Sequence, residues 1–220
     1  SLEAPTNLLA SIRAGAISLG LFAVVTAAAI SLTYIAGSES IAANKAAAKA
    51  RALSAVMPPH LYDQSLLSAP LKLVDYVQLS LSLPAIGYAA VKSGITQAIV
   101  LPVIAKDGYS GDISLLVGID QHGSIQGVRV IEHRETPGLG DKVERKKSPW
   151  VDSFNGRSLA NTPTDDWAVT KDGGVFDGFT GATITPRAVI NAVHQGLLYH
   201  QRHHSALYSV AQERTLIHNC

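Results

Sequence analysis

A run of 24 residues without a charged side chain, residues 14–37, constrains this chain more than any other feature. At about 1.5 Å per residue, a helix of this length reaches roughly 36 Å, which exceeds the ~30 Å hydrocarbon core of a bilayer. The apolar region of a cleaved signal peptide is shorter, about 7–15 residues. The sequence therefore predicts a transmembrane helix over residues 14–37, preceded by an N-terminal tail over residues 1–13.

The basic residues around this segment do not fix its orientation. Arg13 precedes it, whereas Lys45, Lys49 and Arg51 follow it. Counted plainly, the positive-inside rule places the C-terminal side in the cytoplasm. Large following domains, however, are translocated largely regardless of their charge, so the charges leave the orientation open.

The rest of the chain predicts an α+β fold with an antiparallel sheet and helices packed on one face. Alanine-rich residues 38–59 predict a stalk helix that stops at Pro58-Pro59, residues 60–200 form the folded domain, and residues 201–220 are a polar tail. A helix is expected after Pro186. We expect strands at residues 73–81, 85–94 and 96–105, one hairpin of residues 113–120 and 125–133 turning at His122-Gly123, and a second hairpin around residues 172–174.

Composition argues against several function classes. The net charge is +1 and no basic patch is interleaved with aromatic residues, so we expect no nucleic-acid partner. The single cysteine, Cys220, allows neither an intrachain disulfide nor a cysteine metal site. His200, His203 and His204 have helical spacing, but there is no HExxH motif, and a solvated helix end is the better interpretation. There is also no GxSxG motif for a serine nucleophile. We expect no metal site and no catalytic residue.

The stretch DGFTGATITP, residues 177–186, is dense in small hydroxyl residues at the start of a predicted helix. Thr185 suits the N-cap and Pro186 the first helical position. Gly181 and Ala182 would let a ligand approach the backbone, and a helix N-terminus favours phosphate. Thr183 stands where its hydroxyl would lie beside that phosphate. From spacing alone, a plain capped turn is the favoured interpretation and a phosphate site is the alternative.

Two further loops have the composition of ligand-binding loops. Residues 135–141, ETPGLGD, contain glycines that allow close approach. They are not a dinucleotide fingerprint, because Val143 occupies the third small position and no βαβ unit surrounds them. Residues 106–112 form either a tight turn or a loop whose Tyr109 stacks on a flat ligand.

These motifs together resemble the G subunit of the Rnf (Rsx) ion-translocating electron-transport complexes. DGFTGAT, residues 177–183, matches all seven positions of the covalent flavinylation motif of bacterial FMN-binding domains. DGYSG, LLVGID, ETPGLGDK and WAVTKDGG resemble the same family, and the similarity runs over residues 89–199. The related C subunit of the sodium-pumping NADH:quinone reductase shares the threonine motif but differs in these loops.

The resemblance implies that a flavin transferase uses FAD to attach FMN through a phosphoester to Thr183. It also implies a set of neighbouring contacts, which we expect as follows: Thr180, Gly181, Ala182, Ile184 and Thr185 around the phosphate; Thr136, Gly138, Leu139 and Glu135 near the ring or ribityl chain; Tyr109 and Ser110 at the border of the pocket.

The resemblance further implies a single-pass protein of the bacterial inner membrane, with the FMN domain on the periplasmic side and with lipid and other membrane subunits as partners. Its role would be that of an electron carrier in an ion-translocating complex. A membrane-tethered flavin sensor remains an alternative. A free-standing flavin reductase is disfavoured, because no catalytic acid, base or nicotinamide site stands out in the sequence.

Overall fold

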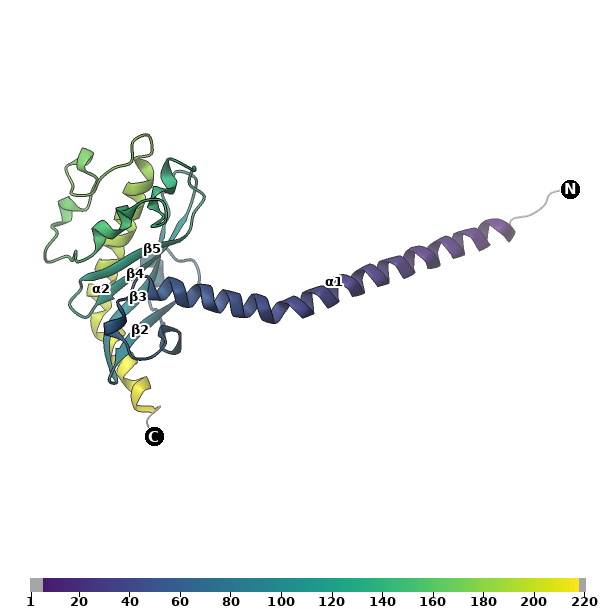
Figure 1. The fold of residues 1–220 in the computed structure, drawn as a ribbon, viewed down its shortest axis with the longest axis horizontal. Helices are drawn as coiled ribbons and strands as arrows, with labels where there is room; N and C mark the ends of the chain where they lie inside the picture. Colours follow the sequence, from purple (N-terminus) through teal and green to yellow (C-terminus); the bar gives the residue numbers. More distant parts are fainter. Residues whose placement is uncertain (1–5, 218–220) are drawn as a thin grey trace. The chain divides into compact units, whose positions relative to one another are not determined.

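The computed structural model describes residues 6–217, which divide after Ala48 into two units (Figure 1). The described part of the first unit belongs to α1 (Thr6–Ser54), whose last residues belong to the second unit. This helix runs without a break over the expected membrane segment and most of the expected stalk. Within the described residues, Ile12–Leu32 is the one helical stretch long and apolar enough to cross a membrane, with a mean hydropathy of 2.1. The helix stops at Ser54, before Pro58, rather than at residue 59.

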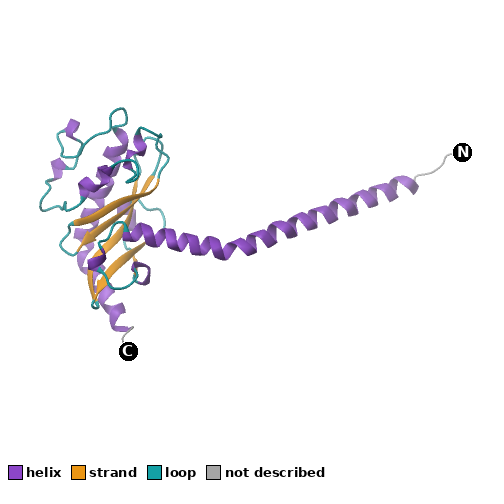
Figure 2. Ribbon diagram, viewed as in Figure 1, coloured by secondary structure: helices purple, strands orange, loops and turns teal. Residues whose placement is uncertain are grey.

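The second unit is a five-stranded antiparallel sheet in the order β1-β2-β3-β4-β5, with α2 packed against it (Figure 2). The α+β class is therefore confirmed. The elements are β1 (Pro70–Lys72), β2 (Ile86–Lys92), β3 (Ile95–Ala105), β4 (Ile113–Asp120), β5 (Ile125–Glu132) and α2 (Ile184–Ile217), with 3-10 helices η1 (Pro59–Leu61), η2 (Leu66–Ser68), η3 (Tyr76–Leu79), η4 (Gly140–Val143), η5 (Pro149–Phe154), η6 (Thr164–Asp166) and η7 (Thr170–Asp172).

The hairpin of β4 and β5 forms as expected, with its turn at residues 121–124. The Asp120 carboxylate accepts the backbone N–H groups of His122 at 2.8 Å and of Ser124 at 3.0 Å. Gly123 has a φ of +79°, which few other residues adopt, so the glycine makes this tight turn possible.

Both faces of the sheet are covered, whereas the sequence led us to expect helices on one face only. Side chains of β3 alternate between the faces: Ile99 and Leu101 belong to the cluster under α2, and Ala98 and Val100 to a second cluster with Val56. The second cluster forms because β4 and β5 carry glycines there. A Cβ added at Gly118 would lie 2.2 Å from the Val56 carbonyl oxygen, and a Cβ added at Gly127 would lie 2.9 Å from the Val56 Cα atom.

Two expected β elements are absent from the described residues. Residues 73–81 contain the 3-10 helix η3 instead of a strand, because Asp75 and Ser80 on either side adopt left-handed conformations. In place of the expected hairpin around residues 172–174 the structure has η7, with one isolated parallel bridge between the residues on either side of it, Val169 and Phe176.

Residues 201–217 are not a loose tail but the continuation of α2. Leu207 is buried against the core, and His200 is only 2% exposed. The His200 ring nitrogen lies 3.1 Å from the Tyr208 hydroxyl, and His204 donates to the Gln121 carbonyl at 3.0 Å. The expectation of a solvated histidine cluster is therefore wrong. Burial lowers the pKa of His200 to about 4, with a smaller contribution from neighbouring His204.

Candidate functional site

The first turn of α2 begins two residues earlier than the sequence suggested. Ile184 is its first residue, and the Thr183 carbonyl accepts the Arg187 N–H at 3.4 Å. Thr183, rather than Thr185, therefore stands at the cap position. Thr185 lies inside the first turn and is fully buried. Pro186 is tolerated there, because the first-turn amides have no intrahelical acceptor.

The three threonines of this region differ in what their hydroxyls do. The Thr185 hydroxyl donates to the Glu135 carboxylate. The hydroxyls of exposed Thr180 and half-buried Thr183 make no hydrogen bond within the described residues. A threonine at this position normally caps the helix with its hydroxyl. At Thr183 the hydroxyl instead remains available, next to the unpaired amides of the first turn.

The turn before the helix leaves its backbone open. Gly181 has a φ of +80°, and a Cβ added there would meet only Leu139, at 3.6 Å. The Ala182 N–H donates to the Phe179 carbonyl at 3.1 Å and closes the turn. Because the first turn of α2 contains no acidic residue and carries the positive end of the helix dipole, it is suited to an anion.

Glu135 joins the three sequence motifs. Its side chain is 4% exposed, and one carboxylate oxygen accepts the Ser110 N–H at 2.9 Å while the other accepts the Thr185 hydroxyl. Gly140 lies against the same group: a Cβ there would be 2.7 Å from the carboxylate and 2.8 Å from the Thr185 hydroxyl. The contacts of Glu135 thus bring together the three segments that the sequence singled out, residues 106–112, 135–141 and 177–186.

The 135–141 loop is internally fixed. Three backbone N–H groups, those of Leu139, Gly140 and Asp141, point at the Thr136 carbonyl at 3.1, 3.1 and 3.4 Å. The Asp141 carboxylate accepts the Gly138 N–H at 2.8 Å, and Gly138 has a φ of +79°. The loop therefore presents Leu139 on a rigid frame.

Three apolar side chains remain exposed on the three joined segments. Tyr109 is 69% exposed, Leu139 is 42% exposed and Ile184 is 47% exposed. Of these, Leu139 borders the turn before Thr183, because a Cβ added at Gly181 would lie 3.6 Å from its side chain. Together with the free hydroxyl of Thr183 and the helix amides, the three side chains offer both an anion site and apolar contact area.

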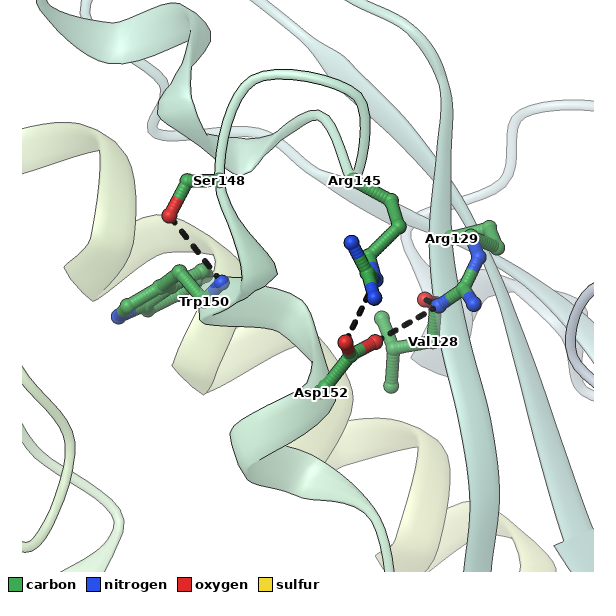
Figure 3. A network of polar contacts seen from close by, with 6 residues as sticks. All are labelled: Val128, Arg129, Arg145, Ser148, Trp150 and Asp152. Atoms are coloured by element: carbon green, nitrogen blue, oxygen red, sulfur yellow. Dashed lines mark hydrogen bonds and ion pairs between the residues drawn. The ribbon is translucent and has the colours of Figure 1, made fainter.

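The segment before the threonines is anchored by Trp150, which the sequence patterns did not connect with this site. Its indole N–H donates to the Asp177 carbonyl at 2.7 Å, and its ring meets Phe179 edge-on with centroids 5.0 Å apart. Ser148 caps the short helix η5 by accepting the Trp150 N–H at 3.2 Å (Figure 3). The Ser-Pro-Trp sequence, a cap followed by proline, was the signal that could have revealed it.

Ion pairs are found at η5 and at the first turn of α2. Figure 3 shows Asp152 of η5 between Arg145, at 2.5 Å, and Arg129 of β5, at 3.4 Å. At the first turn, Arg187 of α2 makes two bonds of 2.6 and 2.7 Å to Asp172. That bidentate contact lowers the pKa of Asp172 and raises the pKa of Arg187.

Comparisons with known proteins match both units. Residues 108–198 match the family model of the FMN-binding domain, and residues 7–56 match that of the RnfG N-terminal region. The G subunit of the ion-translocating oxidoreductase complex of Pseudomonas aeruginosa is 45% identical over 189 residues, 86% of this chain and 88% of that protein. The Vibrio cholerae protein of the same description is 42% identical over 202 residues, 92% and 96%. The crystal structure of Shewanella oneidensis NqrC aligns with a TM-score of 0.42 and 24% identity over 63% of this chain and 64% of that one.

Proposed function

Because this chain belongs to the family of the G subunit of the ion-translocating oxidoreductase complex, we propose that it holds FMN covalently on Thr183 and relays electrons through it. Family membership makes the chain a membrane-associated flavoprotein subunit that transfers electrons within such a complex. The FMN-binding region, residues 108–198, contains all three segments that meet at Glu135.

The state of the three threonine hydroxyls is the observation that carries this assignment. Thr185 is fully buried and bonded to Glu135, so a modifying enzyme cannot reach its hydroxyl without opening the fold. Thr180 is exposed but stands four residues before the helix. Thr183 alone combines a partly exposed, unbonded hydroxyl with the position directly before the first helical amides.

The residues around Thr183 fit the parts of FMN. The amides of Ile184 and Thr185 and the positive helix end suit the phosphate. Leu139, Ile184 and Tyr109 supply apolar surface for the flat ring, and the open side of Gly181 lets the ligand approach the backbone. FMN, when bound, supplies the redox chemistry, while the protein holds and orients it.

Attachment would require a flavin transferase and FAD. The Oγ atom of Thr183 forms a bond to the FMN phosphorus, the bond between the two phosphates of FAD breaks, AMP leaves and the hydroxyl proton is lost. Thr180, Gly181 and Ala182 form the turn that the transferase would approach. The resulting phosphoester prevents the cofactor from diffusing away, which matters for a domain on the periplasmic side of the inner membrane.

In this proposal Ile12–Leu32 is the single membrane anchor, surrounded by lipid and by the other membrane subunits of the complex. Gentle solubilisation should co-purify the chain with several polytopic subunits. A flavinylated chain that purifies alone would instead favour a membrane-tethered sensor, and co-purification with the sodium-pumping NADH:quinone reductase would identify it as that complex's C-type subunit.

A threonine panel tests the attachment site. The full chain and its Thr180→Val, Thr183→Val and Thr185→Val variants are co-expressed with a flavin transferase and inspected for ultraviolet fluorescence after denaturing electrophoresis. We expect Thr183→Val to abolish the signal and Thr180→Val to retain it. A fluorescent Thr183→Val protein would refute the assignment.

A further inference from the structure

We infer that Glu135 is a positioning residue, which orients the flavin by tying three protein segments together and does not itself touch the flavin. This inference rests on the proposed attachment at Thr183. Sequence alone led us to expect Glu135 close to the ring or ribityl chain. In the structure, however, its carboxylate is turned inward, away from solvent, and both of its oxygens already accept hydrogen bonds.

The two bonds join distant parts of the chain. Ser110 is 25 residues before Glu135 and Thr185 is 50 residues after it. Each partner is adjacent in sequence to one of the exposed apolar residues, Tyr109 and Ile184. The carboxylate therefore links the placement of the two side chains, because both of their segments bond to it.

The backbone of Glu135 is also held in place, by His133. Its backbone N–H donates to the His133 ring nitrogen Nδ1 at 3.0 Å, and the other ring nitrogen of His133 lies 2.7 Å from the Glu144 carboxylate. Gly140 closes the remaining side, and through Gly140 the carboxylate meets the loop that presents Leu139. A carboxylate held by contacts on several sides fixes the relative positions of the segments bonded to it, and a site that orients a cofactor needs such a fixed frame.

Gly140 offers a way to disturb this arrangement without removing the carboxylate. Its φ is not in the left-handed region, so alanine fits the backbone there. The new methyl group would nevertheless lie 2.7 Å from the carboxylate oxygen and 2.8 Å from the Thr185 hydroxyl, which forces one of them to move. Gly87→Ala is the matched control, because a Cβ there would also make close contacts, at 3.0 Å from the Val100 carbonyl oxygen and 3.1 Å from the Leu73 side chain, but none with Glu135 or Thr185.

The test compares full-length protein flavinylated by co-expression, purified in detergent, as wild type and as Glu135→Gln, Glu135→Ala, Gly140→Ala and Gly87→Ala. Covalent flavin is measured by in-gel fluorescence, and ring orientation by the visible circular dichroism of the flavin and its quenching by iodide. Glutamine can keep both bonds, accepting from Ser110 and donating to the Thr185 oxygen, so it is the conservative variant.

We expect Glu135→Ala and Gly140→Ala to retain covalent flavin but to lose the visible circular dichroism band and admit iodide, while Glu135→Gln and Gly87→Ala keep both properties of the wild type. A folded Glu135→Ala protein with the wild-type band would overturn the inference. If that variant does not fold, a Gly140→Ala protein with the wild-type band would overturn it instead.

Two other outcomes also count against the inference. Loss of the band in Gly87→Ala would show that the band follows general destabilisation, and loss in Glu135→Gln would show that charge rather than hydrogen-bond geometry is what matters. Failure of the proposed function looks different from all of these, because the wild type itself would then carry no covalent flavin on Thr183.

Discussion

Two stretches of α2 each contain a buried polar side chain. One is the first turn at residues 184–187, with Thr185, and the other is the histidine-rich turns at residues 200–208, with His200. At the first turn, Thr185 bonds to Glu135 and leaves the neighbouring Thr183 hydroxyl and the helix amides without partners among the described residues. At the second, His200 and Tyr208 bond to each other, and their rings pack edge to face.

The difference separates a binding site from a packed polar cluster. The histidine-rich turns contain more ionisable groups, but His200, His204 and Tyr208 already make hydrogen bonds within the domain, and the Nε2 atom of His203, which makes none among the described residues, is buried. The first turn contains fewer such groups but exposes an unbonded hydroxyl beside apolar Ile184 and Leu139. What distinguishes the first turn is therefore an unpaired group that stays accessible to a ligand, and changes at the two places should affect different measurements.

Acid should produce the largest effect, at the histidine-rich turns. Burial holds the pKa of His200 at about 4, below the ordinary value of 6.5. The unfolded chain therefore binds a proton before the folded protein does. The contribution to stability is complete above pH 6.5 and is lost as the pH falls from 6.5 to 4, by about 3 kcal/mol.

Urea unfolding of the full chain in detergent at pH 7 and pH 4 measures this loss, with His200→Phe as the reference that does not titrate. The difference between wild type and variant should change by about 3 kcal/mol between the two pH values. Covalent flavin should be the same in both proteins. If the difference in unfolding free energy is the same at both pH values, His200 is not held in a buried, neutral state.

Thr185→Val should have the next largest effect, at the first turn. It removes the hydroxyl but keeps the shape, so one oxygen of buried Glu135 loses its donor, which lowers the free energy of unfolding by about 2 kcal/mol. Thr185→Ser, which keeps the hydroxyl, is the control and should lose less. Thr183→Val should change stability little, because its hydroxyl has no partner to lose among the residues described. A stability loss at Thr183 equal to that at Thr185 would erase the distinction between them.

Tyr208→Phe should have a smaller effect. It removes the hydroxyl that pairs with His200 and should lower the free energy of unfolding by about 1 kcal/mol, measured by urea unfolding at pH 7. In-gel flavin fluorescence should equal that of the wild type. Loss of attached flavin in this variant would show that the two stretches of α2 are not separate.

The exposed ion pair between Arg187 and Asp172 should matter least for stability. Both side chains are solvated, so Asp172→Asn should lower the free energy of unfolding by less than Tyr208→Phe does. The effect should shrink further in high salt, which screens exposed charges. A loss that persists in high salt would indicate that the pair is structurally important to the first turn.

Sequence patterns predicted the parts of this fold that depend on local chemistry. The β4–β5 hairpin follows from alternating apolar residues and Gly123, and the loops near Thr183 follow from their small residues. The role of Thr185 could not be read in the same way. Its local context suits a cap, but its partner Glu135 lies 50 residues away, and only the folded chain brings them together.

Packing decided the remaining differences. Gly118 and Gly127 look like weak points in strands, but they make room for Val56 on the second face of the sheet. The residues after His200 look polar overall, yet Leu207 is buried and extends the packed helix. In each case the decisive contact joins residues distant in sequence, which local periodicity does not register.

The attachment of FMN is tested most directly by mass spectrometry of the tryptic peptide of residues 172–187, which contains Thr180, Thr183 and Thr185. The peptide from protein matured with a flavin transferase should be heavier by the mass of FMN minus water, and fragment ions should place that mass on Thr183. An unmodified peptide, or the added mass on Thr180 or Thr185, would contradict the account.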